Sequence, residues 1–153
     1  PRKAPAVMGP FFGRSVSIPY GGFCLEAMDS HGGWIANAND VLTFTLAFDD
    51  PKTCKILKEE TVELMFERPQ DEDSKKETYY AKGWSVQQFN NGKARAYWHD
   101  GALDGSTAMV ARRPDRIAWV YLLNSREKTS DGDPLNVLTR PMHLAANYCF
   151  SKN

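Results

Sequence analysis

From Tyr79 onward the apolar residues of the chain recur at every second position, and this pattern constrains the fold more than any other feature. Alternation of this kind is typical of half-buried β-strands. Trp84 and Val86 alternate with polar neighbours, and the alternation resumes after Asn90-Asn91-Gly92, a sequence that favours a tight hairpin turn. A further strand is expected over Thr107–Ala111. Because hairpins join antiparallel neighbours, this half of the chain predicts an antiparallel meander.

The last expected strand has a different composition. Ile117–Leu123 is apolar on both faces, which is typical of a central strand covered on each side. Just before it, Arg113–Arg116 is expected to form a turn, with Pro114 in the second position that proline favours.

Two helices are expected before these strands and one after them. Asn37 is predicted to cap the first helix, with Asp40 in the capping-box position, and Pro51 ends it. The second helix is expected over about residues 58–68. The third is expected from about Pro134, because the helical period returns there.

The remaining segments carry weaker signals. Residues 1–33 are rich in Gly and Pro and predict irregular structure, and Pro141 is expected to split or kink the last helix. Residues 70–77 mix both charges without an apolar residue, which predicts a solvated loop. Helices, then antiparallel strands, then a helix predict an α+β fold, an antiparallel sheet flanked by helices, in a single domain over residues 1–153.

Charge and hydropathy exclude some partners. Nineteen basic residues balance nineteen acidic ones, so the chain offers no electrostatic footprint for nucleic acid. The longest apolar run is Ala118–Leu123, far shorter than the roughly 20 residues of a membrane-spanning helix. No leader is apparent after Pro1. The compartment therefore stays open on composition alone.

The cysteines and histidines do not form a metal-binding pattern. Metal sites usually draw on closely spaced ligands, and these residues are far apart in the sequence. They are Cys24, Cys54 and Cys149, and His31, His99 and His143. We expect no metal and no cofactor, and we expect the thiols to be buried or idle.

The stretch WHDGALDGST, Trp98–Thr107, combines a histidine, two aspartates and two glycines between two expected strands. Taken alone, His-Asp-Gly after a strand is most often a turn. The alternative is that these residues line an active site.

Several segments in order resemble the C-terminal part of the serine β-lactamase and penicillin-binding-protein-like hydrolases. The branch most similar holds class C β-lactamases, D-alanyl-D-alanine peptidases and related esterases. The segments are GGWIANANDVLTF, ILKEETVELM, YYAKGW, HDGALDGST and RRPDRIAWVYLLN, within about residues 31–124. The resemblance implies hydrolysis of an ester, amide or lactam through an acyl-enzyme, on a small-molecule or peptide substrate. It also suggests a periplasmic or other extracytoplasmic location.

In that family a strand ends in a Lys/His-x-Gly triplet at the wall of the active site, and His99-Asp100-Gly101 matches it. A basic or hydrogen-bonding side chain there, here His99, helps to orient the substrate and to stabilise charge. Gly101 would let a substrate approach the backbone closely. The backbone N–H of Ala102 would be one of two oxyanion-hole donors.

The family's nucleophile, in a Ser-x-x-Lys motif at the start of a helix, has no convincing match. Ser125–Lys128 has the spacing but lies in a polar loop, and Ser151-Lys152-Asn153 fits the second motif only at the chain's end, so we treat both as coincidences. We therefore expect the C-terminal part of a longer hydrolase, inactive alone, whose main partner is the N-terminal part of that protein. The alternative is a non-catalytic binding or scaffold domain derived from the same fold.

Two further expectations concern Asp100 and the sheet surface. If Asp100 faces the site, its charge disfavours substrates that carry a free carboxylate; alternatively it points away and caps a turn. The apolar strand Ile117–Leu123 needs a cover from elsewhere in the parent protein, so the chain alone is expected to associate with itself or to be marginally stable.

Overall fold

The computed structural model describes residues 2–70, 76–92, 94–126, 130 and 132–150. Its main feature is one antiparallel sheet of five strands, paired in the order in which they occur in the sequence. The strands are β3 (Thr78–Tyr80), β4 (Ser85–Phe89), β5 (Ala94–Leu103), β6 (Ser106–Arg112) and β7 (Ala118–Leu123). The expected antiparallel meander is confirmed.

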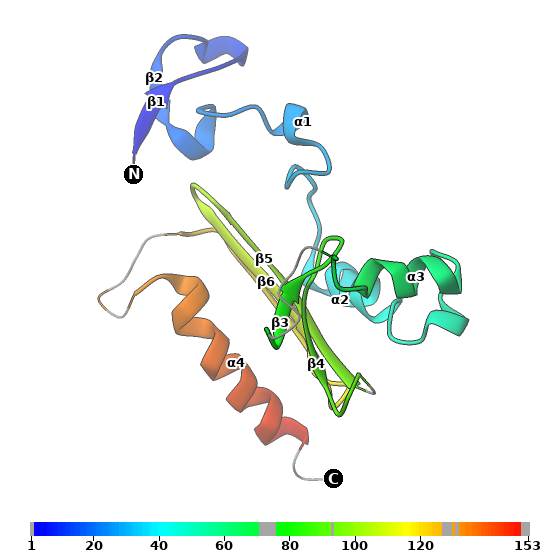
Figure 1. Cartoon of the computed structure of the whole chain (residues 1–153). Coiled ribbons are helices and arrows are strands. Elements are labelled where there is room, and N and C mark those ends of the chain that lie inside the picture. The colour runs from blue at the N-terminus through cyan, green and yellow to red at the C-terminus, as the bar shows by residue number, and fades with distance from the viewer. Residues whose placement is uncertain (1, 71–75, 93, 127–129, 131, 151–153) are drawn as a thin grey trace.

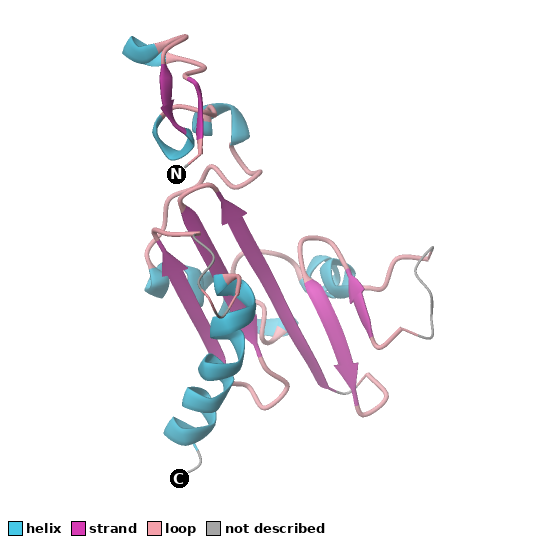
Figure 2. Cartoon of the chain, turned by 90° about the vertical axis from the view of Figure 1, so that its left-hand side faces the viewer, coloured by secondary structure: helices cyan, strands magenta, loops and turns pink. Residues whose placement is uncertain are grey.

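Helices cover the two faces of this sheet (Figures 1 and 2). α2 (Ala38–Leu46) and α3 (Glu59–Phe66) lie on one face, and α4 (Pro134–Phe150) lies on the other. The fold is therefore α+β, as the order of the elements predicts.

The start of α2 follows from its first residues. The Asn37 side chain accepts a hydrogen bond from the Asp40 backbone N–H at 3.0 Å, and its Nδ2 donates to the Asp40 carboxylate at 2.7 Å. This reciprocal pair satisfies a helix N–H that has no partner within the helix, as the sequence predicts. α4 runs through Pro141 as one continuous helix rather than as two.

Each face of the sheet has its own apolar cluster. The larger one joins Phe48, from the segment after α2, and Val62 and Phe66, from α3, to inward side chains of the strands. The strand residues are Tyr79, Val86, Tyr97 and Val110. The smaller cluster packs Trp119 and Tyr121 of β7 against Ala146 of α4.

The position of β7 differs from the prediction of a central strand. Both of its faces are covered, by α2 and by α4, but within the described residues it pairs only with β6 and so forms an edge of the sheet. Apolar residues on both faces of a strand indicate that both faces are buried. They do not indicate how many strands it pairs with.

The N-terminal residues lie beyond the β5–β6 turn, apart from the helices that cover the sheet (Figure 2). We call residues 2–33 the N-terminal arm. It is not wholly irregular as expected: β1 (Lys3–Pro5) and β2 (Ser15–Ser17) pair, 3-10 turns cover Gly9–Phe11 and Ile18–Tyr20, and α1 spans Leu25–Met28. A further 3-10 turn, Pro51–Thr53, follows α2. An ion pair between Arg2 and Asp104 (2.6 Å) connects the arm to the turn.

Candidate active site

The candidate site lies on the second half of β5, where the strand is unpaired on one side. β4 pairs with β5 only from Ala94 to Trp98. β6 pairs with β5 through to Leu103. Among the described residues, the segment His99–Leu103 therefore has a neighbour on one side and an open edge on the other. We call this segment the open half of β5, and residues 94–98 the closed half.

The interpretation of His-Asp-Gly as a turn after a strand is wrong. His99, Asp100 and Gly101 are strand residues that pair with Val110, Met109 and Ala108. Only Asp104 and Gly105 form the turn, and Gly105 has a φ of +84° there. Alternation along β5 is interrupted by a glycine and two polar side chains, so period alone underestimated the strand's length.

The pairing also fixes the direction of the backbone groups on the open half. The Arg113 N–H donates to the Ile117 carbonyl at 2.8 Å, and pairs in an antiparallel ladder alternate between hydrogen-bonded and non-hydrogen-bonded. Counting from this bond through β6 to β5, the N–H and C=O groups of Ala102 project to the open edge. The Ala102 carbonyl accepts a hydrogen bond from Arg126 Nη1 at 3.3 Å, which agrees with this direction.

Side chains of β5 alternate between the two faces of the sheet. Tyr97 lies on the α2 face, where its hydroxyl donates to the Thr45 carbonyl at 3.1 Å. His99 and Gly101 share this face by alternation. The Tyr80 hydroxyl and His99 Nε2 are hydrogen-bonded at 2.9 Å, and the histidine tautomer decides which of the two donates. His99 is exposed, so its imidazole is both oriented and accessible.

Asp100 lies on the opposite face from His99. Burial raises the pKa of Tyr121 on that face, and the negative charge of Asp100 adds to the effect. The Asp100 side chain is exposed on the α4 side of the sheet, and this arrangement favours the alternative in which it points away from the site. Its backbone N–H projects to the open edge, like that of Ala102.

Gly101 is not required by the fold itself. A Cβ added there would meet only the Ala108 Cβ, at 3.8 Å, which is an ordinary contact. A glycine inside a strand weakens the strand and often marks the close approach of a ligand. The position is therefore open to a substrate that lies along the backbone.

Ser125, the serine of the Ser-x-x-Lys match, lies on the far side of β6 from this site. Ser125 follows β7, and its carbonyl accepts a hydrogen bond from the Thr107 hydroxyl of β6 at 2.9 Å. β6 therefore stands between Ser125 and the open edge. Lys128 and residues 151–153 lie outside the described residues.

Sequence reasoning missed two residues that contact the open half. Tyr80 occurs in the YYAKGW segment, but only the hydrogen bond to His99 gives it a place at the site. Arg126 follows β7 and reaches the Ala102 carbonyl across β6. In the described part of the chain, no cluster of three or more His, Cys, Asp or Glu residues could hold a metal ion, and Cys24, Cys54 and Cys149 are free thiols.

The five-stranded antiparallel sheet between helices is an α+β architecture consistent with a β-lactamase-like fold. The chain belongs to the Beta-lactamase family, whose model matches residues 1–141. At the level of the family, this match confirms the resemblance to the serine β-lactamase and penicillin-binding-protein-like hydrolases. No curated protein and no solved structure matches the chain. No helix among the described residues is long and apolar enough to cross a membrane.

Proposed function

We propose that this chain forms one wall of the active site of a longer serine hydrolase, which acts on an ester, amide or lactam through an acyl-enzyme. The parent protein would supply the Ser-x-x-Lys helix and its base. Within the family, we assign the longer protein to the branch of class C β-lactamases, D-alanyl-D-alanine peptidases and related esterases, on the segments quoted above. The single observation that carries the proposal is the outward N–H of Ala102 on the open half of β5, beside His99.

The chemistry needs a donor at this position. When the serine oxygen attacks the substrate carbonyl, a C–O bond forms and the carbonyl electron pair moves to oxygen. An outward backbone N–H can donate to that oxyanion without any rearrangement, because the sheet already holds it in place. The leaving group then departs with a proton, and water later releases the acyl group.

His99 and Gly101 have different tasks in this proposal. His99, oriented by Tyr80, would hydrogen-bond the substrate or the developing charge at the edge of the site. Gly101 would leave space for the substrate backbone beside the strand. Asp100 would contribute its backbone, and its side chain would act only through its charge.

The edge at β7 is where we expect the N-terminal part of the parent to pair. β7 combines cover on both faces with an unpaired edge in the described structure. Large apolar side chains are also exposed before α2, with Trp34 at 80% and Ile35 at 96%. Such surfaces are typical of interfaces, and without the parent's strands they would favour association between copies of the chain.

The test removes the Ala102 N–H in the full-length protein. Ala102→Pro deletes the donor, and proline is tolerated where an edge N–H faces outward. The control Ala102→Val keeps the N–H and adds bulk on the α4 face only. Loss of one oxyanion donor costs about 100- to 1000-fold in kcat.

We expect kcat on a nitrophenyl ester to fall by about that factor in Ala102→Pro, with KM little changed, because the donor acts mainly in the transition state. Ala102→Val should retain kcat within a few-fold. If Ala102→Pro folds and has the same kcat as the unsubstituted full-length protein, Ala102 is not an oxyanion donor. That result would also exclude the proposed wall of the active site.

A further inference from the structure

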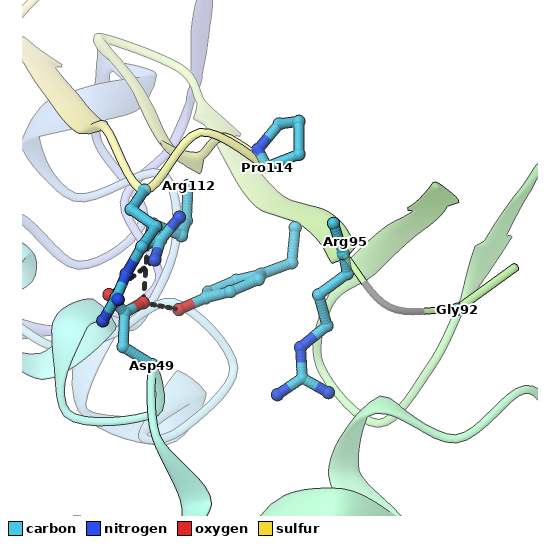
Figure 3. Close-up of a pocket in the computed structure, with 8 residues that line it drawn as sticks. Asp49, Gly92, Arg95, Arg112 and Pro114 are labelled. Carbon is cyan, nitrogen blue, oxygen red and sulfur yellow. Dashed lines mark hydrogen bonds and ion pairs between the residues drawn. The ribbon is translucent and has the colours of Figure 1, made fainter. Parts of the chain in front are cut away.

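A pocket lies at the other end of β5 from the candidate site (Figure 3). It has a volume of about 380 Å³ and lies between the end of α2, the start of β5 and the β6–β7 turn. Its lining includes three arginines and one carboxylate, namely Arg95, Arg112, Arg116 and Asp49. Arg95 and His99 are four positions apart on β5, so their backbones are about 13 Å apart along the strand.

The only carboxylate in the lining is already neutralised. Arg112 binds Asp49 through two nitrogens, Nε and Nη2, each at 2.6 Å. The Tyr97 hydroxyl also donates to Asp49, at 3.0 Å. A bidentate pair of this kind uses the charge of both partners. The described lining therefore has more guanidinium groups than carboxylates, and Arg95 and Arg116 are the two that do not belong to this pair.

Arg95 is a guanidinium with unused donors. It stacks over the Phe66 ring, 3.9 Å from the centroid, and burial lowers the pKa of Arg95. Within the described residues, no hydrogen bond or ion pair to its nitrogens is present. A guanidinium has five N–H donors in a rigid fork, so those of Arg95 are available to a ligand.

We propose that this pocket binds an oxyanion group, phosphate or carboxylate, through the two arginines of its lining that are not paired with Asp49, Arg95 and Arg116. A planar fork held by an aromatic ring suits such a group, since two parallel N–H donors match two oxygens. The site is independent of the proposed hydrolase chemistry, because it lies at the opposite end of the strand.

The competitor for Arg95 is the acidic side of α3. A second pocket, which Arg95 also lines, contains Glu60, Glu63 and Glu67. Glu63 acts on Arg95 through its charge but forms no ion pair with it in the described structure. If Arg95 formed an ion pair with Glu63 in solution, Arg95 would not contribute to the binding of an anion in the first pocket. The experiment separates these two outcomes.

The test titrates inorganic phosphate, and in a second arm acetate, into the full-length protein by calorimetry. Sodium chloride at equal ionic strength controls for screening. The variants are Arg95→Gln and Arg116→Gln, and the matched control is Arg140→Gln, on exposed α4 across the sheet. Loss of one charged hydrogen-bonding partner weakens binding by about tenfold or more.

We expect saturable binding of phosphate or acetate, weakened about tenfold in each pocket variant and unchanged within about twofold in Arg140→Gln. Tighter phosphate than acetate would identify a phosphate site, and the reverse order a carboxylate site. The proposal would be overturned if Arg95→Gln bound phosphate and acetate as tightly as the unsubstituted protein. It would also be overturned if sodium chloride gave the same calorimetric signal.

Discussion

The two halves of β5 belong to one strand but have different surroundings. In the closed half, Tyr97 is 2% exposed and its hydroxyl shares its one hydrogen between two acceptors, the Thr45 carbonyl and Asp49. In the open half, His99, Asp100 and Gly101 are all exposed, and the backbone has an unpaired side among the described residues. Pairing on both sides uses every backbone group for stability, whereas one free side leaves donors available for chemistry.

The comparison indicates how a rigid sheet can present a reactive backbone. The closed half and β6 hold the strand, so the outward N–H groups of the open half need no ordering when a ligand arrives. A donor that is already in position is more effective than one that must reorganise. The following predictions test this division between the two halves.

The largest expected effect is the absence of catalysis by this chain when the rest of the proposed longer protein is missing. The chain by itself should not hydrolyse a chromogenic cephalosporin or a short-chain nitrophenyl ester, because the described residues offer no Ser-Lys pair at the open edge. Purified chain is assayed beside Ser125→Ala. Turnover that survives purification and disappears in Ser125→Ala would make the polar-loop serine the nucleophile.

Asp49→Ala should be the most damaging change to the closed half. It leaves the Arg112 guanidinium, whose side chain is 7% exposed, without its carboxylate and removes an acceptor of Tyr97. Breaking a buried pair on one side costs about 3–5 kcal/mol. Urea unfolding of the full-length protein measures the loss. The control Asp115→Ala breaks the pair of Arg113 with an Asp115 side chain that is 43% exposed, and should cost about 1 kcal/mol or less.

Proline at two positions should distinguish the halves directly. Ala96 and Ala102 are an even number of positions apart, so both N–H groups project to the β4 side, where only Ala96 has a partner residue, Gln87. Ala96→Pro removes a ladder hydrogen bond and should lower the free energy of unfolding by about 2 kcal/mol or more. Ala102→Pro should change it by less than about 1 kcal/mol. Equal losses in thermal or urea unfolding would mean that the second half is paired in solution.

The smallest effect is expected for Asp100→Thr in the full-length protein. A carboxylate facing the substrate, about 5 Å from another negative charge, would repel it by roughly 3 kcal/mol, more than 100-fold in affinity. Because Asp100 lies on the face opposite His99, we expect affinity for a carboxylate-bearing β-lactam to improve by less than about fivefold. The measurement is the inhibition constant of the β-lactam for the unsubstituted protein and for Asp100→Thr. A 100-fold gain in affinity would mean that the Asp100 side chain faces the substrate.

The sequence by itself determined the elements and the family. The capping pair at Asn37, the turn at Asn90–Gly92 and the two-residue period are local signals, and the structure forms an α2 helix and a β4–β5 hairpin at those positions. The same is true of the family, since the quoted segments resemble it and its model matches residues 1–141. Local patterns are sufficient here because capping, turn geometry and alternation act between residues close in the chain.

Only the tertiary structure decided which strand edges are unpaired and which side chains meet there. The sequence could not indicate that β4 stops beside Trp98, that β7 is an edge, or that Tyr80 meets His99. It also placed Asp100 beside His99 in the chain, while the pleat separates their side chains onto opposite faces. These features depend on register and on the lengths of neighbouring strands, which are set by packing between residues far apart in the sequence.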